Sequence, residues 1–251
     1  MIQNLNAFLH ALNPVKFAVQ CLGLQPDPKQ ALVLGHTARR GLLNCSRQWG
    51  KSTITAAKAV HRAVYRPGSL IVVLSPSARQ SGEFVRKAAD FLKRLDIRPR
   101  GDGDNELSLL FPNGSRIVGL PGAEGTIRGF SAVSLLLIDE ASRVSDESYK
   151  AASPMRAVGE GDLWLMSTPF GKRGFFWDTW SGPDARWERI LAPAPECPRI
   201  SPEFLAQERE SLGDRWFRQE YLCEFVSDDE SLFDRDLIDA ALDPDLEPLL
   251  L

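Results

Sequence analysis

Runs of mainly apolar residues, each as long as a strand, recur along the first two thirds of the chain. They lie at residues 41–45, 69–75, 133–139 and 162–168. Between them the apolar positions follow a helical period, near residues 53–65, 77–95 and 146–157. Because apolar strands that alternate with helices form parallel sheets covered on both faces, this pattern predicts an α/β fold with a mostly parallel sheet.

Two further features of the pattern complete the predicted organisation. Apolar runs at residues 107–111 and 116–120 flank an Asn-Gly pair, which favours a hairpin added antiparallel to the sheet. Residues 184–200 are rich in proline and predict a connection, followed by short helices near 202–211 and 214–223. We therefore divide the chain into a core (residues 1–185), a small helical lid (186–233) and an acidic tail (234–251).

The composition is that of an ordinary globular protein, with 43% hydrophobic and 25% charged residues in 251. No apolar run approaches the roughly 20 residues that span a bilayer, and the amino terminus lacks the pattern of a signal peptide. The four cysteines are far apart and form no CxxC pair, so structural zinc is not expected. We expect reduced thiols in a cytosolic setting.

The charge is unevenly distributed along the chain. Residues 201–251 carry 15 acidic and 4 basic residues, so a net charge of −3 leaves the first 200 residues at +8. A polyanionic partner would meet the amino-terminal body and be repelled by the tail. An acidic tail that only keeps the protein soluble is the alternative.

The segment from Asn44 to Thr53 has the spacing of a phosphate-binding loop, G-x-x-x-x-G-K-[ST], with Cys45 in place of the first glycine. In such loops backbone N–H groups surround the phosphates, the lysine reaches the β and γ oxygens and the hydroxyl binds Mg²⁺. A Gly-Lys-Ser triplet also occurs by chance, but here a strand precedes it and a helix follows. The candidate nucleotide-binding residues are Ser46, Arg47, Gln48, Trp49, Gly50, Lys51, Ser52 and Thr53.

A second motif consists of four apolar residues followed by Asp139 and Glu140. In nucleotide hydrolases of this type the first carboxylate holds the hydrated Mg²⁺ and the second polarises the attacking water as general base. Both would emerge at the carboxyl end of the sheet beside the phosphate loop. A strand followed by an acid-capped helix is the alternative, and the phosphate loop earlier in the chain favours the functional interpretation.

A third motif, Ser167-Thr168-Pro169, ends the next apolar strand. A Ser/Thr pair there can hydrogen-bond a phosphate-bound water or contact a segment that moves with nucleotide state. A simple turn that ends at the proline is equally compatible with the residues.

Together these motifs resemble the ATPase domain of the large terminase subunit, the DNA-packaging motor of tailed bacteriophages. The resemblance covers the chain from about Pro14 to Phe233. It is carried by the Arg-Gln-x-Gly-Lys-Ser loop, Leu136–Ala141, the Ser167-Thr168-Pro169 coupling motif and residues 219–225. It implies a P-loop NTPase fold of the ASCE, RecA-like class. It also implies ATP hydrolysis with Mg²⁺ held by Ser52 and Asp139, and translocation of double-stranded viral DNA into a procapsid.

The resemblance implies roles for three further residues. Gln30 matches the glutamine that reads the adenine edge, although from the residues alone it is an ordinary surface glutamine. Arg47 would face the γ-phosphate, and Arg128 matches an arginine that reaches the neighbouring subunit's nucleotide. The two arginines compete for the role of arginine finger, and the sequence leaves open which acts in cis and which in trans. A loop-capping arginine is the alternative for Arg128.

Residues 75–100 resemble the helicase-like segment after the second strand and hold seven basic and three acidic residues. Phe84, Ala88, Phe91 and Leu95 trace a core-facing stripe, so we expect an apolar inner face and a basic outer one. Phosphate contacts from the basic face would be independent of DNA sequence and dependent on salt. Whether that face meets DNA or another subunit is open.

Full-length large terminases continue into a ribonuclease H-like nuclease domain, and this chain ends near where that domain would begin. We expect no nuclease activity, and we interpret the terminal acids (Asp228, Asp229, Glu230, Asp234, Asp236, Asp239) as linker and helix surface. The implied partners are double-stranded DNA, the portal protein, the small terminase subunit and further copies of the chain in a ring on the procapsid. The implied location is the bacterial host cytoplasm, with no membrane association. Alternatives are another DNA-stimulated, helicase-like ATPase and an assembly module that binds nucleotide without hydrolysing it.

Overall fold

A computed structural model describes residues 2–102, 105–122 and 129–226. Its centre is an eight-stranded sheet in the order β3-β4-β5-β2-β6-β7-β1-β8. The strands are β1 Arg40–Cys45, β2 Leu70–Ser75, β3 Arg100–Asp102, β4 Asn105–Leu110, β5 Arg116–Pro121, β6 Leu135–Asp139, β7 Asp162–Ser167 and β8 Glu188–Ala192. The pairs from β5 to β8 are parallel, whereas β3, β4 and β5 pair antiparallel. The predicted mostly parallel α/β sheet and its antiparallel hairpin are confirmed.

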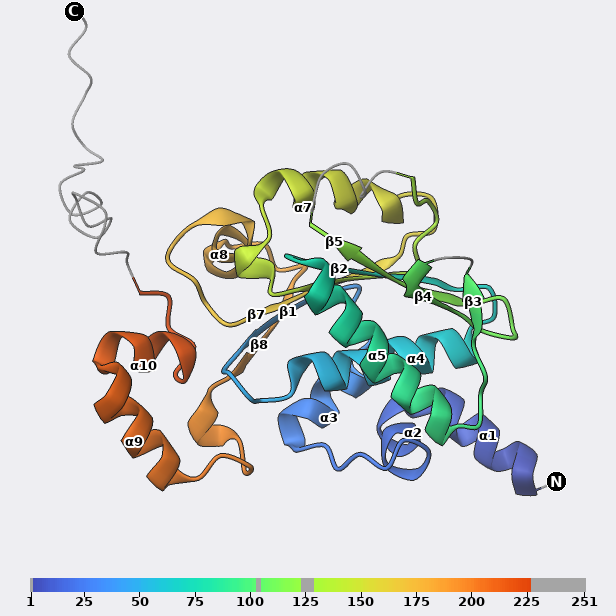
Figure 1. Ribbon diagram of the computed structural model, residues 1–251, viewed down its shortest axis with the longest axis horizontal. Coiled ribbons are helices and arrows are strands. Elements are labelled where there is room, and N and C mark those ends of the chain that lie inside the picture. The colour runs from blue at the N-terminus through green and yellow to red at the C-terminus, as the bar shows by residue number, and fades with distance from the viewer. Residues whose placement is uncertain (1, 103–104, 123–128, 227–251) are drawn as a thin grey trace, which may run out of the picture.

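Helices cover both faces of the sheet, as Figure 1 shows. The α-helices are α1 Ile2–Leu12, α2 Pro14–Gln20, α3 Pro28–Gly35, α4 Lys51–Tyr65, α5 Ala78–Arg94, α7 Asp146–Ala152, α8 Gly174–Ser181, α9 Pro202–Leu212 and α10 Asp214–Glu220. Short 3-10 helices follow β6 (Ala141–Arg143), α7 (Ser153–Arg156) and β8 (Ala194–Glu196). Helices α1 to α3 were not anticipated from the sequence. In Figure 1 helices α1 to α5 lie on one side of the sheet and α7 and α8 on the other.

The alternation of side chains along each strand produces two hydrophobic cores. Leu43 and Leu137 point to the core beneath α2 to α5, whereas their neighbours Leu42 and Leu136 point to the core beneath α7 and α8. All four side chains are completely buried. This two-sided burial explains why the central strands are apolar at nearly every position.

One close approach inside the sheet requires a glycine. Gly41 of β1 is the register partner of Trp164 in β7. A Cβ atom on Gly41 would lie 2.3 Å from the indole ring. The ring of Trp164 therefore occupies the space that a side chain at residue 41 would need.

The prediction that residues 184–200 form only a connection is wrong for Glu188–Ala192. These residues form β8, which pairs parallel with β1 at the edge of the sheet. Residues 188, 189 and 191 are not buried, so the strand lacks the continuous apolar run that marks the central strands. A division between core and lid thus belongs after Ala192 rather than near residue 185, and the division itself remains a prediction.

Helices α9 and α10 form a small unit beside the β8 edge of the sheet (Figure 1). Their own apolar cluster joins Leu205, Phe217 and Tyr221 to Ala194, which follows β8. The backbone N–H of Ala194 donates to the carbonyl oxygen of Tyr221 at 2.7 Å. This contact fixes the end of α10 next to the carboxyl ends of β1 and β8.

Candidate functional site

The predicted phosphate loop connects the end of β1 to the start of α4. Cys45 is the last residue of the strand and Lys51 the first of the helix. Gln48 and Gly50 have φ angles of 59° and 96°, so the loop turns sharply before the helix begins. The first N–H groups of α4 therefore face the loop, which is the arrangement that binds phosphate.

The loop is held in place through its backbone. The N–H of Ser46 donates to Ala192 in β8, and the N–H of Arg47 donates to Glu220 in α10, both at 3.0 Å. The carbonyl oxygen of Trp49 accepts from Gln30 Nε2 and from Arg199 Nη2, both at 2.7 Å. The Trp49 side chain is 1% exposed, so it anchors the loop and only its backbone faces the site.

Four side chains of the two predicted motifs meet at the carboxyl ends of β1 and β6. The Lys51 ammonium lies 2.8 Å from Oε1 of Glu140. The hydroxyl of Ser52 donates to Oδ2 of Asp139 at 3.1 Å. Thr53 lies in the first turn of α4, where its N–H donates to the carbonyl oxygen of Gly50. The structure thus brings the phosphate loop and the carboxylate pair together, as the sequence predicts.

Burial and charge shift the titration of this cluster. Burial raises the pKa of the Asp139 carboxyl, and the Lys51 charge offsets part of that rise. Burial alone would lower the pKa of Lys51, but the negative charges of Glu140 and Asp139 raise it above its ordinary value. Lys51 is therefore a permanent cation beside two acids, which is the requirement for holding phosphate oxygens.

Ser167 and Thr168 lie next to the candidate base. The Ser167 hydroxyl contacts the Ser142 hydroxyl at 2.7 Å and donates to Oε2 of Glu140 at 3.4 Å. The carbonyl oxygen of Thr168 accepts from Ser142 at 2.8 Å. Both predicted coupling residues are almost completely buried. Glu140 itself has a φ of 53°, a strained backbone angle for a non-glycine residue at the turn that joins these segments.

Gln30 is not a surface residue. It is 5% exposed and forms a capping box with Asp27 at the start of α3. Its amide nitrogen holds the Trp49 carbonyl, and a Cβ on Gly50 would lie 3.1 Å from that nitrogen. Arg199 completes the group through an ion pair with Asp27 at 3.0 Å. Asp27 and Arg199 were not predicted as site residues, because no motif in the sequence marks them.

Arg47 pairs with helix α10. Its Nε lies 2.6 Å from Oε2 of Glu220, a carboxylate that is 3% exposed. Arg143, which no motif marked, lies 3.7 Å from both Glu140 and Glu220. A cavity of about 420 Å³ lies beside Arg47 and helices α9 and α10, lined by Arg47, Glu208, Ser211, Leu212, Trp216, Glu220 and Tyr221.

The remaining predicted positions have different outcomes. Arg128 lies outside the described residues, as do the terminal acids from Asp228 onward. Helix α5 has the predicted two faces, with Phe84, Ala88 and Phe91 buried. On its outer face Arg86 and Lys93 pair with Glu83 and Asp90, so part of the basic charge is balanced locally.

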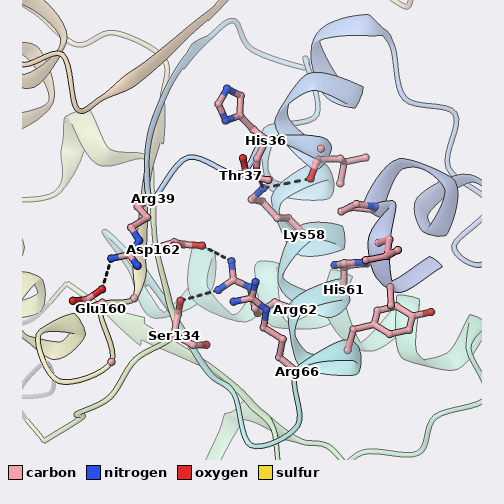
Figure 2. Close-up of a pocket in the computed structure, with 18 residues that line it drawn as sticks. His36, Thr37, Arg39, Lys58, His61, Arg62, Arg66, Ser134, Glu160 and Asp162 are labelled. Atoms are coloured by element: carbon pink, nitrogen blue, oxygen red, sulfur yellow. Dashed lines mark hydrogen bonds and ion pairs between the residues drawn. The ribbon is translucent and has the colours of Figure 1, made fainter. Parts of the chain in front are cut away.

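A second cavity, of about 630 Å³, lies at the opposite, amino edge of the sheet (Figure 2). Lys58 reaches into it and donates to the carbonyl oxygens of Val33, Leu34 and His36 at the end of α3. Arg62 pairs with Asp162 at the start of β7. Burial lowers the pKa of Lys58 to about 8, and the neighbouring Arg62 adds to the effect. None of the predicted site residues lines this cavity, and its buried lysine caps α3.

Comparison with known proteins finds a matching family model and curated relatives. The family model described as "Terminase large subunit, T4likevirus-type, N-terminal" matches residues 42–240. The terminase large subunits of Thermus phage G20c and Thermus virus P23-45 are each 27% identical over 259 residues, which cover 88% of this chain and 53% of theirs. The chain thus spans about half the length of these curated relatives.

Solved structures confirm the fold. The large terminase ATPase domain of Thermus phage P74-26 matches with a TM-score of 0.76 at 24% identity, over 86% of this chain and all of that one. The HK97 large terminase matches with a TM-score of 0.72 at 18% identity, over 85% and 55%. The large terminase of a thermophilic bacteriophage in complex with ATP-γ-S matches with a TM-score of 0.65 at 12% identity, over 86% and 52%. With a family match across most of its length, the chain belongs to the T4-like terminase large subunit family, as its N-terminal domain.

Proposed function

We propose that this chain hydrolyses ATP and that hydrolysis drives double-stranded viral DNA into a procapsid. One observation carries the proposal: Lys51, Ser52, Asp139 and Glu140 converge at the carboxyl ends of β1 and β6. The thermophilic phage terminase solved in complex with ATP-γ-S has the same fold, which supports the proposal that this chain binds nucleotide.

The oxygens of Ser52 and Asp139 suit Mg²⁺, which prefers hard oxygen ligands. They lie 3.1 Å apart, and a buried carboxylate whose pKa is raised gains from a neighbouring cation. Bound there, Mg²⁺ would neutralise charge on the β- and γ-phosphate oxygens. The residues present therefore fit the ion that the family implies.

The remaining residues have defined tasks in this proposal. Lys51 and the backbone of residues 46–52 hold the phosphates. Glu140 orients the attacking water and accepts its proton, and Ser167, which contacts Glu140, relays nucleotide state together with Thr168. Gln30, whose amide holds the Trp49 carbonyl of the loop, is the candidate contact for adenine. Arg47 and Arg128 are the two candidates for the arginine finger.

The proposal extends to an assembly. Copies of the chain would form a ring on the procapsid with the portal protein and the small terminase subunit, in the cytoplasm of the bacterial host. The family assignment supports this part. Within the described ranges no helix has both the length and the apolar character that crossing a membrane requires.

The direct test is phosphate release from ATP with Mg²⁺, with and without double-stranded DNA. Lys51→Ala should abolish turnover, whereas Arg186→Met, which changes an exposed residue of a local ion pair, should match the wild type. Wild-type protein that releases no phosphate even with DNA and portal would favour a module that binds nucleotide without hydrolysing it.

The ring and its arginine finger require a second experiment. ATP hydrolysis is measured against protein concentration for the wild type and Arg128→Ala. A trans-acting finger predicts a steep rise with concentration that the variant lacks. If hydrolysis per chain is independent of concentration, or if Arg128→Ala rises as the wild type does, Arg128 is not an intersubunit finger.

A further inference from the structure

Five charged side chains form an unbroken row of ion pairs that begins and ends in the phosphate loop. Lys51 contacts Glu140 at 2.8 Å, and Glu140 lies 3.7 Å from Arg143. Arg143 lies 3.7 Å from Glu220, which contacts Arg47 at 2.6 Å. Cations and carboxylates alternate along it, and Arg143 stands at its centre.

The centre of this row of ion pairs is less exposed to solvent than its Arg47 end. Glu220 is 3% exposed and Arg143 29%, whereas the Arg47 side chain is 58% exposed. The Arg143 guanidinium also lies 4.6 Å from the centre of the Phe170 ring. Phe170 directly follows the Ser167-Thr168-Pro169 segment. Arg143 therefore lies beside the candidate base, helix α10 and the residue that follows the coupling segment.

Nucleotide phosphates would compete for the cations at the two ends of the row, Lys51 and Arg47. Lys51 would turn from Glu140 to the phosphate oxygens, and Arg47 is exposed enough to turn from Glu220. Within the described residues Arg143 is then the cation that remains beside both carboxylates. A buried carboxylate that loses one cationic partner depends more strongly on the other, so Glu140 and Glu220 would both be drawn to Arg143.

We propose that Arg143 is a positioning residue that joins Glu140 to Glu220 and thereby couples the occupancy of the phosphate loop to helix α10. The inference rests on the proposed function, because it assigns a role within the same site. A guanidinium suits the task, since its five donors can serve two carboxylates in fixed directions. A lysine in its place offers one compact charge and cannot reproduce both contacts.

The first test is a double-mutant cycle on ATP hydrolysis with Arg143→Met, Glu220→Gln and both together, and Arg186→Met as the matched control. Each single change should lower kcat about 10- to 100-fold and leave KM within about threefold of the wild type, with the double variant no worse than the poorer single one. Arg143→Lys should stay impaired, whereas a role in packing or net charge alone predicts its rescue. The proposal is wrong if the kcat losses of the two single variants multiply in the double variant. It is also wrong if Arg143→Met has a normal kcat.

The second test does not require turnover. Hydrogen exchange of residues 214–220 is measured in wild-type protein with and without Mg²⁺ and ATP-γ-S, and then in Arg143→Met at matched saturation. Protection of α10 should change on binding in the wild type and not in the variant. A wild type that binds nucleotide with no change at α10 contradicts the coupling.

The two proposals fail in distinguishable ways. Wild-type protein that neither binds nor hydrolyses ATP refutes the proposed function. Wild-type protein that hydrolyses ATP, with Arg143→Met indistinguishable from Arg186→Met, refutes the role of Arg143 alone.

A further measurement uses the nucleotide-free protein. There Arg143→Met should raise hydrogen exchange in α10, and unchanged exchange would contradict the role of Arg143.

Discussion

The Lys51 ammonium lies 2.8 Å from Oε1 of Glu140, so the two groups proposed to hold phosphate and to activate water contact each other. Each neutralises the other at a site where both are mostly buried. Phosphate oxygens that attract Lys51 would therefore free Oε1 of Glu140 for the attacking water, while Arg143 remains beside Oε2. Nucleotide binding and activation of the base are thus linked through one contact.

The buried carboxylate of Asp139 predicts a conflict between stability and function. Burial raises its pKa, so without metal the folded protein loses stability as pH rises from the ordinary aspartate range through this raised value. Asp139→Asn removes the buried charge and keeps the shape. At pH 7 without metal we expect stability to rise by about 1 kcal/mol, or about 2–4 °C in Tm. The rise in Tm caused by Mg²⁺ and nucleotide should disappear.

Thermal unfolding with and without Mg²⁺ and ATP-γ-S measures both effects. Asp178→Asn, a change at an exposed position on α8, is the matched control and should leave both unchanged. A metal-free Tm for Asp139→Asn several degrees below that of the wild type would show that the carboxylate stabilises the fold without metal.

Lys58 illustrates a buried cation with a structural task. Its ammonium caps the last carbonyls of α3, the helix that carries Gln30 against the loop. Lys58→Met leaves these carbonyls without that donor and should cost about 1–3 kcal/mol in the free energy of unfolding. Urea unfolding measures the loss, with Lys16→Met at an exposed position of α2 as the control. Equal stability of the Lys58→Met variant and the wild type would exclude the capping role.

The same lysine predicts a pH dependence. Burial lowers its pKa from 10.5 to about 8, so between these values the unfolded chain binds more protons than the folded one. The contribution of Lys58 to stability therefore rises with pH from about 8 to about 10.5. In Lys58→Met this part of the slope should be absent. If stability rises with pH as steeply in Lys58→Met as in the wild type, groups other than Lys58 cause the rise.

Central strands and paired motifs could be predicted from the sequence because each depends on neighbouring residues. The runs at β2, β6 and β7 are apolar on both faces. The phosphate loop can be identified from the spacing of its residues along the sequence. Strand β8 could not be predicted, because an edge strand that is partly exposed lacks the apolar run. Arg143 and Glu220 lie far apart in the sequence and meet only because α10 folds back onto the loop.

Cys45 should be chemically inert despite its place at the head of the loop. Burial raises the pKa of its thiol to about 12, so the thiolate is scarce at neutral pH. Alkylation at pH 8, followed by peptide mass spectrometry, should label the partly exposed Cys21 well before Cys45. In urea the two should react alike. Rapid labelling of Cys45 in the folded protein would contradict its burial.

The outer face of α5 is the candidate contact for DNA phosphates. Arg79, Arg86 and Lys93 are exposed there, and two of them pair with acids on the same helix. Replacing all three by alanine should weaken binding to duplexes of any sequence. The slope of log K against log salt should fall by about 2 to 3. Fluorescence anisotropy across salt concentrations measures it, with Arg186→Ala as control. An unchanged slope would assign this face to another partner.

The central claim is that Glu140 is the general base of an ATPase. Its direct test is single-turnover hydrolysis of Mg²⁺-ATP by wild type and Glu140→Gln, with ATP affinity measured in parallel. Because glutamine keeps the size of the side chain but accepts no proton, we expect the rate to fall about 10²- to 10⁴-fold. Affinity should stay within a few-fold of the wild type. Near-normal hydrolysis by Glu140→Gln would contradict the account.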